Sequence, residues 1–259
     1  MDKLECAKQA ALKGGAVALR YFNTTELNVR EKALNNLVTQ ADVESEECIV
    51  SYIKKSFPGH GFFAEENHHS GNMVEDDVWI IDPIDGTNNY AHAIPHFCIS
   101  VAYAHKGEVM AGVVYDPLRN EIFTASKGSG AFLNNKQIRI SHRRNLAESI
   151  ITTGFNYDRG AIMEKTLTTI RALFLCHIQG IRRTGSAALD MCWVASGRFD
   201  GYFEYLLSPW DFAAGMLIVR EAGGICGDCT GKPLDIHANS VAVSNLHIYE
   251  EFLNHVRWE

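Results

Sequence analysis

The 259-residue chain lacks several features that would place it in a membrane-bound or exported class of protein. It has no run of about 18 apolar residues, so no transmembrane helix is expected. Residues 1–5, Met-Asp-Lys-Leu-Glu, lack the basic and then apolar arrangement of a signal peptide. Internal repeats, low-complexity tracts and long linkers are also absent. We therefore expect a cytoplasmic protein without a membrane partner.

The sequence has no excess of positive charge. Its 24 basic and 31 acidic residues give a net charge of −7. Such a protein has no general attraction for nucleic acid, which argues against a non-specific nucleic-acid binder. The adjacent pairs Arg143-Arg144 and Arg182-Arg183 are weak evidence for a local basic patch. Contact with nucleic acid or with the transcription machinery is not expected, but stays open as an alternative.

The cysteines and histidines lack the spacing of a zinc site. The seven cysteines are scattered and odd in number, as is typical of reduced thiols. Cys226 and Cys229 have C-x-x-C spacing, but a structural zinc site needs two more ligands and no second C-x-x-C exists. His92 and His96 are four residues apart, but Pro95 between them argues against a helical pair. We therefore favour packing and loop roles for these residues.

Apolar residues make up 46% of the chain, enough for a sizeable core. In residues 1–145 the pattern predicts an α+β unit with an antiparallel sheet, and in residues 146–259 strands alternate with helices as in an α/β layer. The predicted helices cover 2–22, 42–56, 161–174, 186–196, 210–222 and 246–256. The predicted strands cover 27–31, 61–64, 78–82, 97–104, 109–115, 121–126, 149–154, 178–183, 200–205 and 240–244. We expect the first unit to carry a metal and phosphate site and the second to add Asp211 and substrate contacts.

The segment Trp79–Tyr90, WIIDPIDGTNNY, is the most informative in the chain. Its apolar strand ends at Asp82 and Asp85, and carboxylates clustered at a strand end suit hard divalent cations. A turn at Gly86 leads into a short helix, whose free N–H groups suit a phosphate. Together these features predict metal-assisted chemistry on a phosphate ester. The alternative is a polar turn after a buried strand, because Asp-Pro and Asp-Gly are common turn dipeptides.

Two further carboxylates extend this hypothesis. Glu65 follows the apolar strand 61–64, and Asp211 opens a predicted helix. With Asp82 and Asp85 they bring four negative charges, which two Mg²⁺ ions would neutralise. A third Mg²⁺ ion would give the site a net positive charge that attracts a phosphate dianion. Because every ligand is an oxygen, Mg²⁺ fits better than zinc. For Asp211 the alternative is an ordinary first-turn residue favoured by the helix dipole.

The chain resembles the inositol monophosphatase family, within the lithium-sensitive, Mg²⁺-dependent phosphatase superfamily, over nearly its whole length. Residues 79–90 look like the first signature of the family, and residues 210–224 look like the second. Residues 63–66 resemble its Gly-Glu-Glu element, with Ala64 where glycine is usual, and residues 37–42 resemble its early Leu-Val-Thr-x-x-Asp element. The resemblance implies a layered αβαβα sandwich.

The resemblance also implies roles for individual residues, with two or three Mg²⁺ ions as cofactors. Thr87, hydrogen-bonded to Asp42, should orient the attacking water, and Glu65 should help to hold the weakest ion. The backbone N–H groups of Gly86 and Thr87 should bind phosphate oxygens. The implied metal ligands are Glu65, Asp82, the carbonyl of Ile84, Asp85 and Asp211. The implied substrate contacts are Asp85, Gly185, Ser186, Ala187 and Glu204. For Glu204 the alternative is the solvated end of a short strand.

The activity that the resemblance implies is hydrolysis of small phosphate monoesters, with inositol-1-phosphate first, by direct in-line attack of a metal-activated water. The alternatives are fructose-1,6-bisphosphate, histidinol phosphate or nucleotide phosphate as substrate, or an added regulatory role as an interaction protein. A homodimer is also implied, with contacts near residues 182–186. Asn36 stands where an aspartate is common, in a loop with Lys32, which predicts weaker affinity for a third metal ion.

Overall fold

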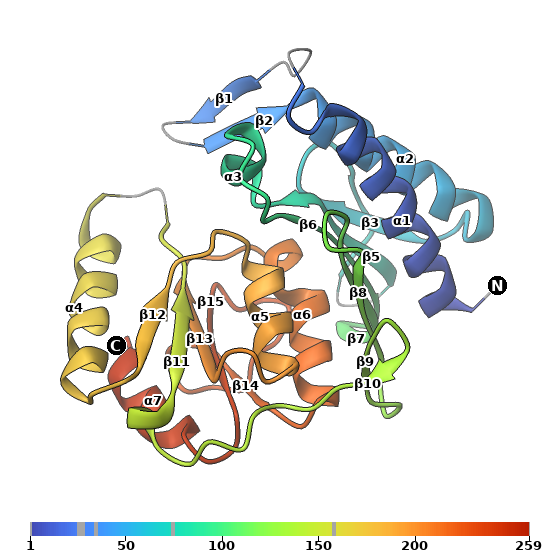
Figure 1. Ribbon diagram of the computed structural model, residues 1–259. Coiled ribbons are helices and arrows are strands. Elements are labelled where there is room, and N and C mark those ends of the chain that lie inside the picture. The colour runs from blue at the N-terminus through green and yellow to red at the C-terminus, as the bar shows by residue number, and fades with distance from the viewer. Residues whose placement is uncertain (1, 25–28, 34–35, 74–75, 157–158, 259) are drawn as a thin grey trace.

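The computed structural model is a stack of alternating helical and sheet layers (Figure 1). It describes residues 2–24, 29–33, 36–73, 76–156 and 159–258, and for residues 29–33 and 36–38 it describes the strands but not the side chains. The predictions for Lys32 and Asn36 therefore lie outside the described side chains. Within the described residues, no helix is both long and apolar enough to cross a membrane.

Two helices cover one face of a large sheet. Helices α1 (Lys3–Tyr21) and α2 (Gln40–Ser56) pack on an eight-stranded sheet of order β10-β9-β8-β7-β6-β5-β3-β4. Side chains alternate between its faces, so Trp79 and Ile81 contact this helical layer while Val78 and Ile80 point the other way. The strands are β3 (Gly61–Ala64), β4 (His69–Ser70), β5 (Asp77–Asp85), β6 (Cys98–His105), β7 (Glu108–Asp116), β8 (Glu121–Ser126), β9 (Ala131–Leu133) and β10 (Lys136–Gln137).

One pairing in this sheet differs from the antiparallel arrangement expected for the first half. Strand β3 runs parallel to β5, with Ala64 beside Ile81. Between them in the chain, the short strand β4 runs antiparallel to β3, so β5 starts at the same end of the sheet as β3. The other pairs of the large sheet are antiparallel. As a result the carboxyl ends of β3 and β5 lie at the same edge.

A small hairpin and a short helix stand above this edge. Strands β1 (Val29–Ala33) and β2 (Asn36–Thr39) pair antiparallel, and β2 leads directly into α2. Of the predicted strand over 27–31, residues 29–31 lie in β1 and the rest lies outside the described residues. Helix α3 (Thr87–Ala91) follows the end of β5. Figure 1 places α3 beside β2.

Helices α5 (Ala187–Ala195) and α6 (Pro209–Glu221) lie between the large sheet and a second, five-stranded sheet (Figure 1). They are buried on nearly all sides, as expected for helices that are apolar all round. The second sheet has the order β12-β11-β13-β15-β14, and α4 (Ala161–Leu175) and α7 (Tyr249–Val256) cover its outer face. Its strands are β11 (Ile150–Thr153), β12 (Gly180–Arg182), β13 (Gly201–Tyr205), β14 (Ile225–Gly227) and β15 (Ser240–Ser244), and the 3₁₀ turn η1 (Leu146–Glu148) precedes them.

The layered αβαβα sandwich is therefore the fold of this chain, and the differences from the predicted elements are local. Strands β2, β4, β9, β10 and β14 were not predicted. The last four have only two or three residues, which is too short to show a period. The last helix begins at Tyr249 rather than 246. The predicted boundary between residues 145 and 146 falls between β10 and η1, and the central core contains side chains from both sides of it.

Candidate active site

Three carboxylates from distant parts of the chain meet beside the end of β5. The side chains of Asp82, Asp85 and Asp211 each offer an oxygen within 4.8 Å of the others. Asp82 and Asp85 lie where the pairing of β5 with β6 shifts register, which turns both side chains toward the middle of the molecule. Asp211 lies in the first turn of α6, where its carboxylate also accepts a hydrogen bond of 2.7 Å from the Ser208 N–H. The first-turn role and the cluster role of Asp211 therefore coexist.

Glu65 reaches the same place because β3 is parallel to β5. Its N–H donates to the carbonyl of Ile81 at 3.2 Å, which carries the parallel pairing one residue past β3. Glu65 lines a cavity of about 260 Å³ together with the three aspartates and Ile84. The predicted metal ligands thus share one cavity, although Glu65 stands outside the tight group of three.

The turn after Glu65 is held by a buried carboxylate that sequence reasoning missed. Glu46 on α2 is fully buried and accepts hydrogen bonds from the N–H groups of Glu66 (2.7 Å), Asn67 (2.8 Å) and His68 (3.1 Å). His68 Nδ1 lies 2.7 Å from the same carboxylate. The available signal was a glutamate on the apolar stripe of the predicted helix over 42–56. Glu46 therefore determines the course of the chain next to Glu65.

The electrostatics of the cluster fit an oxygen-liganded cation. Burial raises the pKa of Asp82 well above its usual value, and the charges of Glu65 and Asp85 raise it further. Burial, followed by the charges of Asp85 and Glu65, also raises the pKa of Asp211. Buried like charges are costly unless a counter-charge lies between them. Because the donors are all oxygens, they suit a hard divalent cation such as Mg²⁺.

Asp85 joins the two halves of the molecule. Burial raises its pKa, but hydrogen bonds from Ser186 Oγ (2.6 Å) and the N–H groups of Ala188 (2.7 Å) and Ala187 (3.3 Å) favour the charged form. These donors belong to the start of α5. Asp85 is thereby oriented by the segment that contains the implied substrate contacts Ser186 and Ala187.

Thr87 and Asp42 lie close enough for the predicted hydrogen bond. Thr87 Oγ1 lies 3.4 Å from an Asp42 carboxylate oxygen and 3.1 Å from the carbonyl of Ile84, so its hydroxyl has two acceptors. Asp42 is fully buried and accepts from the N–H (2.7 Å) and hydroxyl (2.5 Å) of Thr39. Burial raises the pKa of Asp42 to about 7. The pair can orient one water molecule at the cavity wall.

Gly86 allows the two segments of the site to approach closely. It has a φ of +99°, and a Cβ there would lie 3.1 Å from the carbonyl oxygens of Gly185 and His96. Asn89 Nδ2 donates to the carbonyl oxygens of Thr184 (2.8 Å) and His96 (2.7 Å), which fixes the segment before α5 against α3. Gly86, Thr87 and Gly185 all line the cavity.

Glu204 forms the far wall of the cavity and is not a solvated strand end. Tyr202 donates a hydrogen bond of 2.6 Å to it, and burial raises its pKa to about 7. A Cβ at Gly154 would lie 1.9 Å from Glu204 Oε2, so a larger residue there would displace the Glu204 carboxylate. Arg183 and Asp190 also line the cavity, and neither was among the predicted site residues.

This combination of a layered α/β sandwich and a carboxylate-lined cavity between its halves defines a class of metal-binding phosphatase folds. The chain belongs to the inositol monophosphatase family, whose sequence model matches residues 2–259. It is 41% identical to a Nus factor SuhB of Pasteurella multocida (strain Pm70) over 255 residues, which cover 98% of this chain and 95% of the relative.

Solved structures agree with this assignment. An extragenic suppressor protein suhB from Bartonella henselae has a TM-score of 0.92 and 37% identity, with 97% of each chain covered. An inositol monophosphatase from Anabaena (Nostoc) sp. PCC 7120 has a TM-score of 0.87 and 37% identity, with 98% of this chain and 94% of that chain covered.

Proposed function

We propose that this chain is a Mg²⁺-dependent hydrolase of small phosphate monoesters, with inositol-1-phosphate as its first substrate. The observation that carries the proposal is the meeting of Asp82, Asp85 and Asp211 within 4.8 Å, in a cavity that Glu65 also lines. These carboxylates and the Ile84 carbonyl would hold two or three Mg²⁺ ions. When bound, the ions would neutralise charge on the phosphoryl oxygens and lower the pKa of a bound water molecule.

The protein's own groups complete the proposed site. Asp42 accepts from Thr87, which leaves the lone pairs of the Thr87 oxygen free to orient a water molecule for in-line attack. Gly86 and Thr87 line the same cavity, and their backbone N–H groups would bind phosphoryl oxygens. Correct placement of the water and the phosphate lowers the barrier before any bond changes.

The far side of the cavity suits a polyol. Glu204 accepts hydrogen bonds from hydroxyl groups when charged, and Ser186 and Ala187 at the start of α5 line the same cavity. Inositol presents several such hydroxyls, which supports it as the alcohol part of the substrate. The similarity of this chain to the Anabaena inositol monophosphatase also supports inositol as the alcohol part of the substrate. Fructose-1,6-bisphosphate, histidinol phosphate and nucleotide phosphates are the alternatives that a substrate panel must include.

The test is phosphate release from this panel with and without Mg²⁺. Asp85→Asn should lower kcat/KM by on the order of 10³, since removal of a metal-binding charge costs several kcal/mol of transition-state stabilisation. Asp2→Asn, at an exposed position that does not line the cavity, should behave as wild type. Mg²⁺-independent turnover, or an Asp85→Asn variant with full activity, would refute the proposal.

A second role in transcription is favoured by one specific observation, the 41% identity with a protein named Nus factor SuhB over nearly the full length of both chains. In this role the chain would bind a component of the transcription machinery through its surface rather than through the cavity. Co-migration with a reconstituted bacterial transcription elongation complex tests it. Binding by wild type and Asp85→Asn alike is expected, and failure of both to co-migrate would exclude the role.

Three further properties stay predictions. The family resemblance implies a homodimer and inhibition by lithium, and the sequence analysis leads us to expect a cytoplasmic location. Sedimentation and inhibition measurements on the purified protein check the first two directly.

A further inference from the structure

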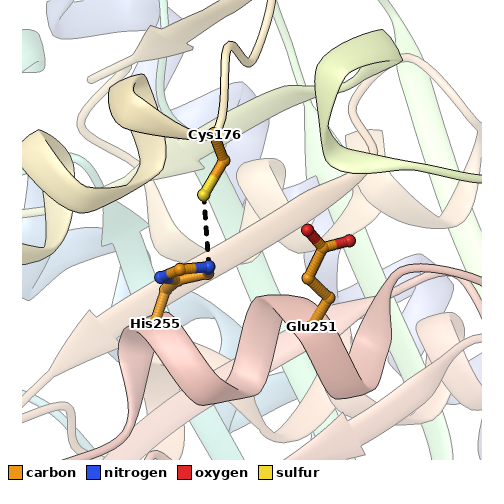
Figure 2. A group of neighbouring side chains, drawn as sticks. All are labelled: Cys176, Glu251 and His255. Atoms are coloured by element: carbon orange, nitrogen blue, oxygen red, sulfur yellow. Dashed lines mark hydrogen bonds between the residues drawn. The ribbon is translucent and has the colours of Figure 1, made fainter.

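A second group of metal-ligand side chains lies away from the cavity, on the outer helical layer (Figure 2). Cys176 caps the carboxyl end of α4, and Glu251 and His255 project from α7 toward it. Cys176 Sγ and His255 Nε2 are 3.2 Å apart. One ligand atom from each of the three residues lies within 4.8 Å of the other two.

The arrangement follows from helix geometry. Glu251 and His255 are four residues apart on α7, so both side chains leave the same face of the helix. The same i, i+4 spacing presents two ligands to one ion in helical zinc sites. Helices α4 and α7 pack on each other over the second sheet, which brings the end of α4 to this face.

The donor set differs in kind from that of the cavity. A thiolate, an imidazole and a carboxylate are the ligands of Zn²⁺ and related borderline cations, whereas Mg²⁺ prefers oxygen alone. Tetrahedral bonds of about 2.3 Å to sulfur and 2.0–2.1 Å to nitrogen would separate the two atoms by about 3.5 Å. The observed 3.2 Å requires a movement of only a few tenths of an ångström. Three protein ligands would leave the fourth position for water.

Charge determines how metal binding at this group would depend on pH. Burial raises the pKa of the Cys176 thiol, and the Glu251 carboxylate raises it further, so the metal-free sulfur keeps its proton at neutral pH. A dication between the two would compensate both negative charges and displace the proton, as metal binding to thiols does. Binding should therefore strengthen as the pH rises.

The other cysteines do not share this environment. Cys226 Sγ and Cys229 Sγ lie within hydrogen-bonding distance of the carbonyl oxygens of Met216 (3.6 Å) and Val241 (3.3 Å), so the C-x-x-C pair faces backbone acceptors. Cys48 and Cys176 are both partly exposed, but Cys48 belongs to no metal-ligand group among the described residues. Cys48 therefore supplies a matched control.

We propose that Cys176, Glu251 and His255 bind one Zn²⁺ ion per chain, which ties α7 to the end of α4. Residues Phe252 and Leu253 of helix α7 belong to the core between the second sheet and its outer helices. A metal tie would restrain this helix from opening. The site is independent of the cavity and of the proposed hydrolysis.

Cobalt(II) is the probe, added in the presence of excess Mg²⁺ so that oxygen-only sites are filled. Wild type should give a near-ultraviolet thiolate-to-cobalt band that saturates at one equivalent per chain and is displaced by Zn²⁺. Cys176→Ser should lose the band and Cys48→Ser should keep it. His255→Gln and Glu251→Gln should weaken Co²⁺ binding tenfold or more. Zn²⁺ should slow amide exchange in α7 of wild type and Cys48→Ser, and not in Cys176→Ser.

Circular dichroism of each variant shows whether it folds. If Cys176→Ser does not fold, the comparison of Co²⁺ affinity between His255→Gln and wild type tests the proposal instead. Absence of a thiolate band in wild type would overturn the proposal. So would a band that survives Cys176→Ser, or a His255→Gln variant that binds Co²⁺ as tightly as wild type. Saturation at half an equivalent would also overturn it, because that indicates a site between two copies.

Discussion

At the scale of single residues, buried carboxylates decide both the geometry and the charge of the cavity. Asp42 accepts hydrogen bonds from Thr39 and Thr87, and Glu46 holds the turn beside Glu65. Asp42 has its pKa raised to about 7 mainly by burial, so its charged form opposes folding when no cation is near. Charged Asp42 therefore lowers the metal-free stability, whereas Glu46 stabilises the turn that it holds.

The pKa of Asp42 predicts how the metal-free stability depends on pH. Its folded value of about 7 lies above the unfolded value of about 3.9, so the folded state holds the proton more strongly. Its contribution to stability is present below about pH 4 and is lost as the pH rises through 7. Denaturant unfolding in EDTA at pH 5 to 8 should show a fall for wild type and a smaller fall for Asp42→Asn. Asp2→Asn should follow wild type; equal slopes for all three would contradict the prediction.

Glu46→Gln tests whether the buried carboxylate positions Glu65. The amide brings a donor toward the N–H groups of Glu66 and Asn67, so we expect a loss of about 1–3 kcal/mol in unfolding free energy. The Mg²⁺ concentration for half-maximal activity should also rise severalfold. Glu47→Gln, one residue further and exposed, is the control. Lower stability with an unchanged Mg²⁺ requirement would make Glu46 a structural residue only.

At the scale of elements, the site is assembled where strands end and helices begin. Asp42 lies in the first turn of α2, Asp211 in the first turn of α6, and Asp85 accepts from the first turn of α5. Carboxylates are favoured there because helix N-termini leave N–H groups without partners. The same physical preference therefore caps helices and directs charged groups toward one cavity.

The N-cap of α2 gives a prediction at this scale. Thr39 Oγ1 accepts from the N–H groups of Ala41 and Asp42, and it donates to the Asp42 carboxylate. Thr39→Ala should cost about 1–2 kcal/mol and lower the Tm by several degrees. Thr39→Ser keeps the hydroxyl and should cost much less. Thermal unfolding of both variants gives the comparison, and equal losses would show that the hydroxyl is not the cause.

At the scale of the whole molecule, the cavity exists only because α6 packs against the large sheet. Gly112 on β7 contacts Ala214 on α6 so closely that a Cβ would lie 3.0 Å from the Ala214 carbonyl oxygen and 3.1 Å from its Cα. Asp211 lies one turn earlier on the same helix. The spacing between sheet and helix therefore sets the distance between Asp211 and the carboxylates of β5.

Gly112→Ala should push the two layers apart. Because the obstacle is backbone, we expect a loss of about 1–3 kcal/mol in unfolding free energy, together with a higher Mg²⁺ requirement. Gly59→Ala is the control, since nothing lies within 4 Å of a Cβ there. Unfolding curves and Mg²⁺ titrations of activity measure both effects. An unchanged Mg²⁺ requirement would show that the helix adjusts without moving Asp211.

Local signals were enough to predict much of this protein. Asp82 and Asp85 stand three residues apart at the end of one apolar strand, and Thr39 caps the helix predicted after it. The longer helices follow from apolar spacing, because that period is written within a few turns. From the residues alone, Asp211 could be explained equally well as a metal ligand or as an ordinary first-turn residue of a helix.

The family resemblance implied that Glu65, Asp82, Asp85 and Asp211 share one site, but only the tertiary structure showed how these distant groups meet. The parallel pairing of β3 with β5 brings Glu65 beside Asp82, and the packing of α6 adds Asp211. Glu46 and the group around Cys176 were likewise visible only after folding. Contacts between residues a hundred positions apart leave no local pattern, since they depend on how layers stack rather than on the period of any one element.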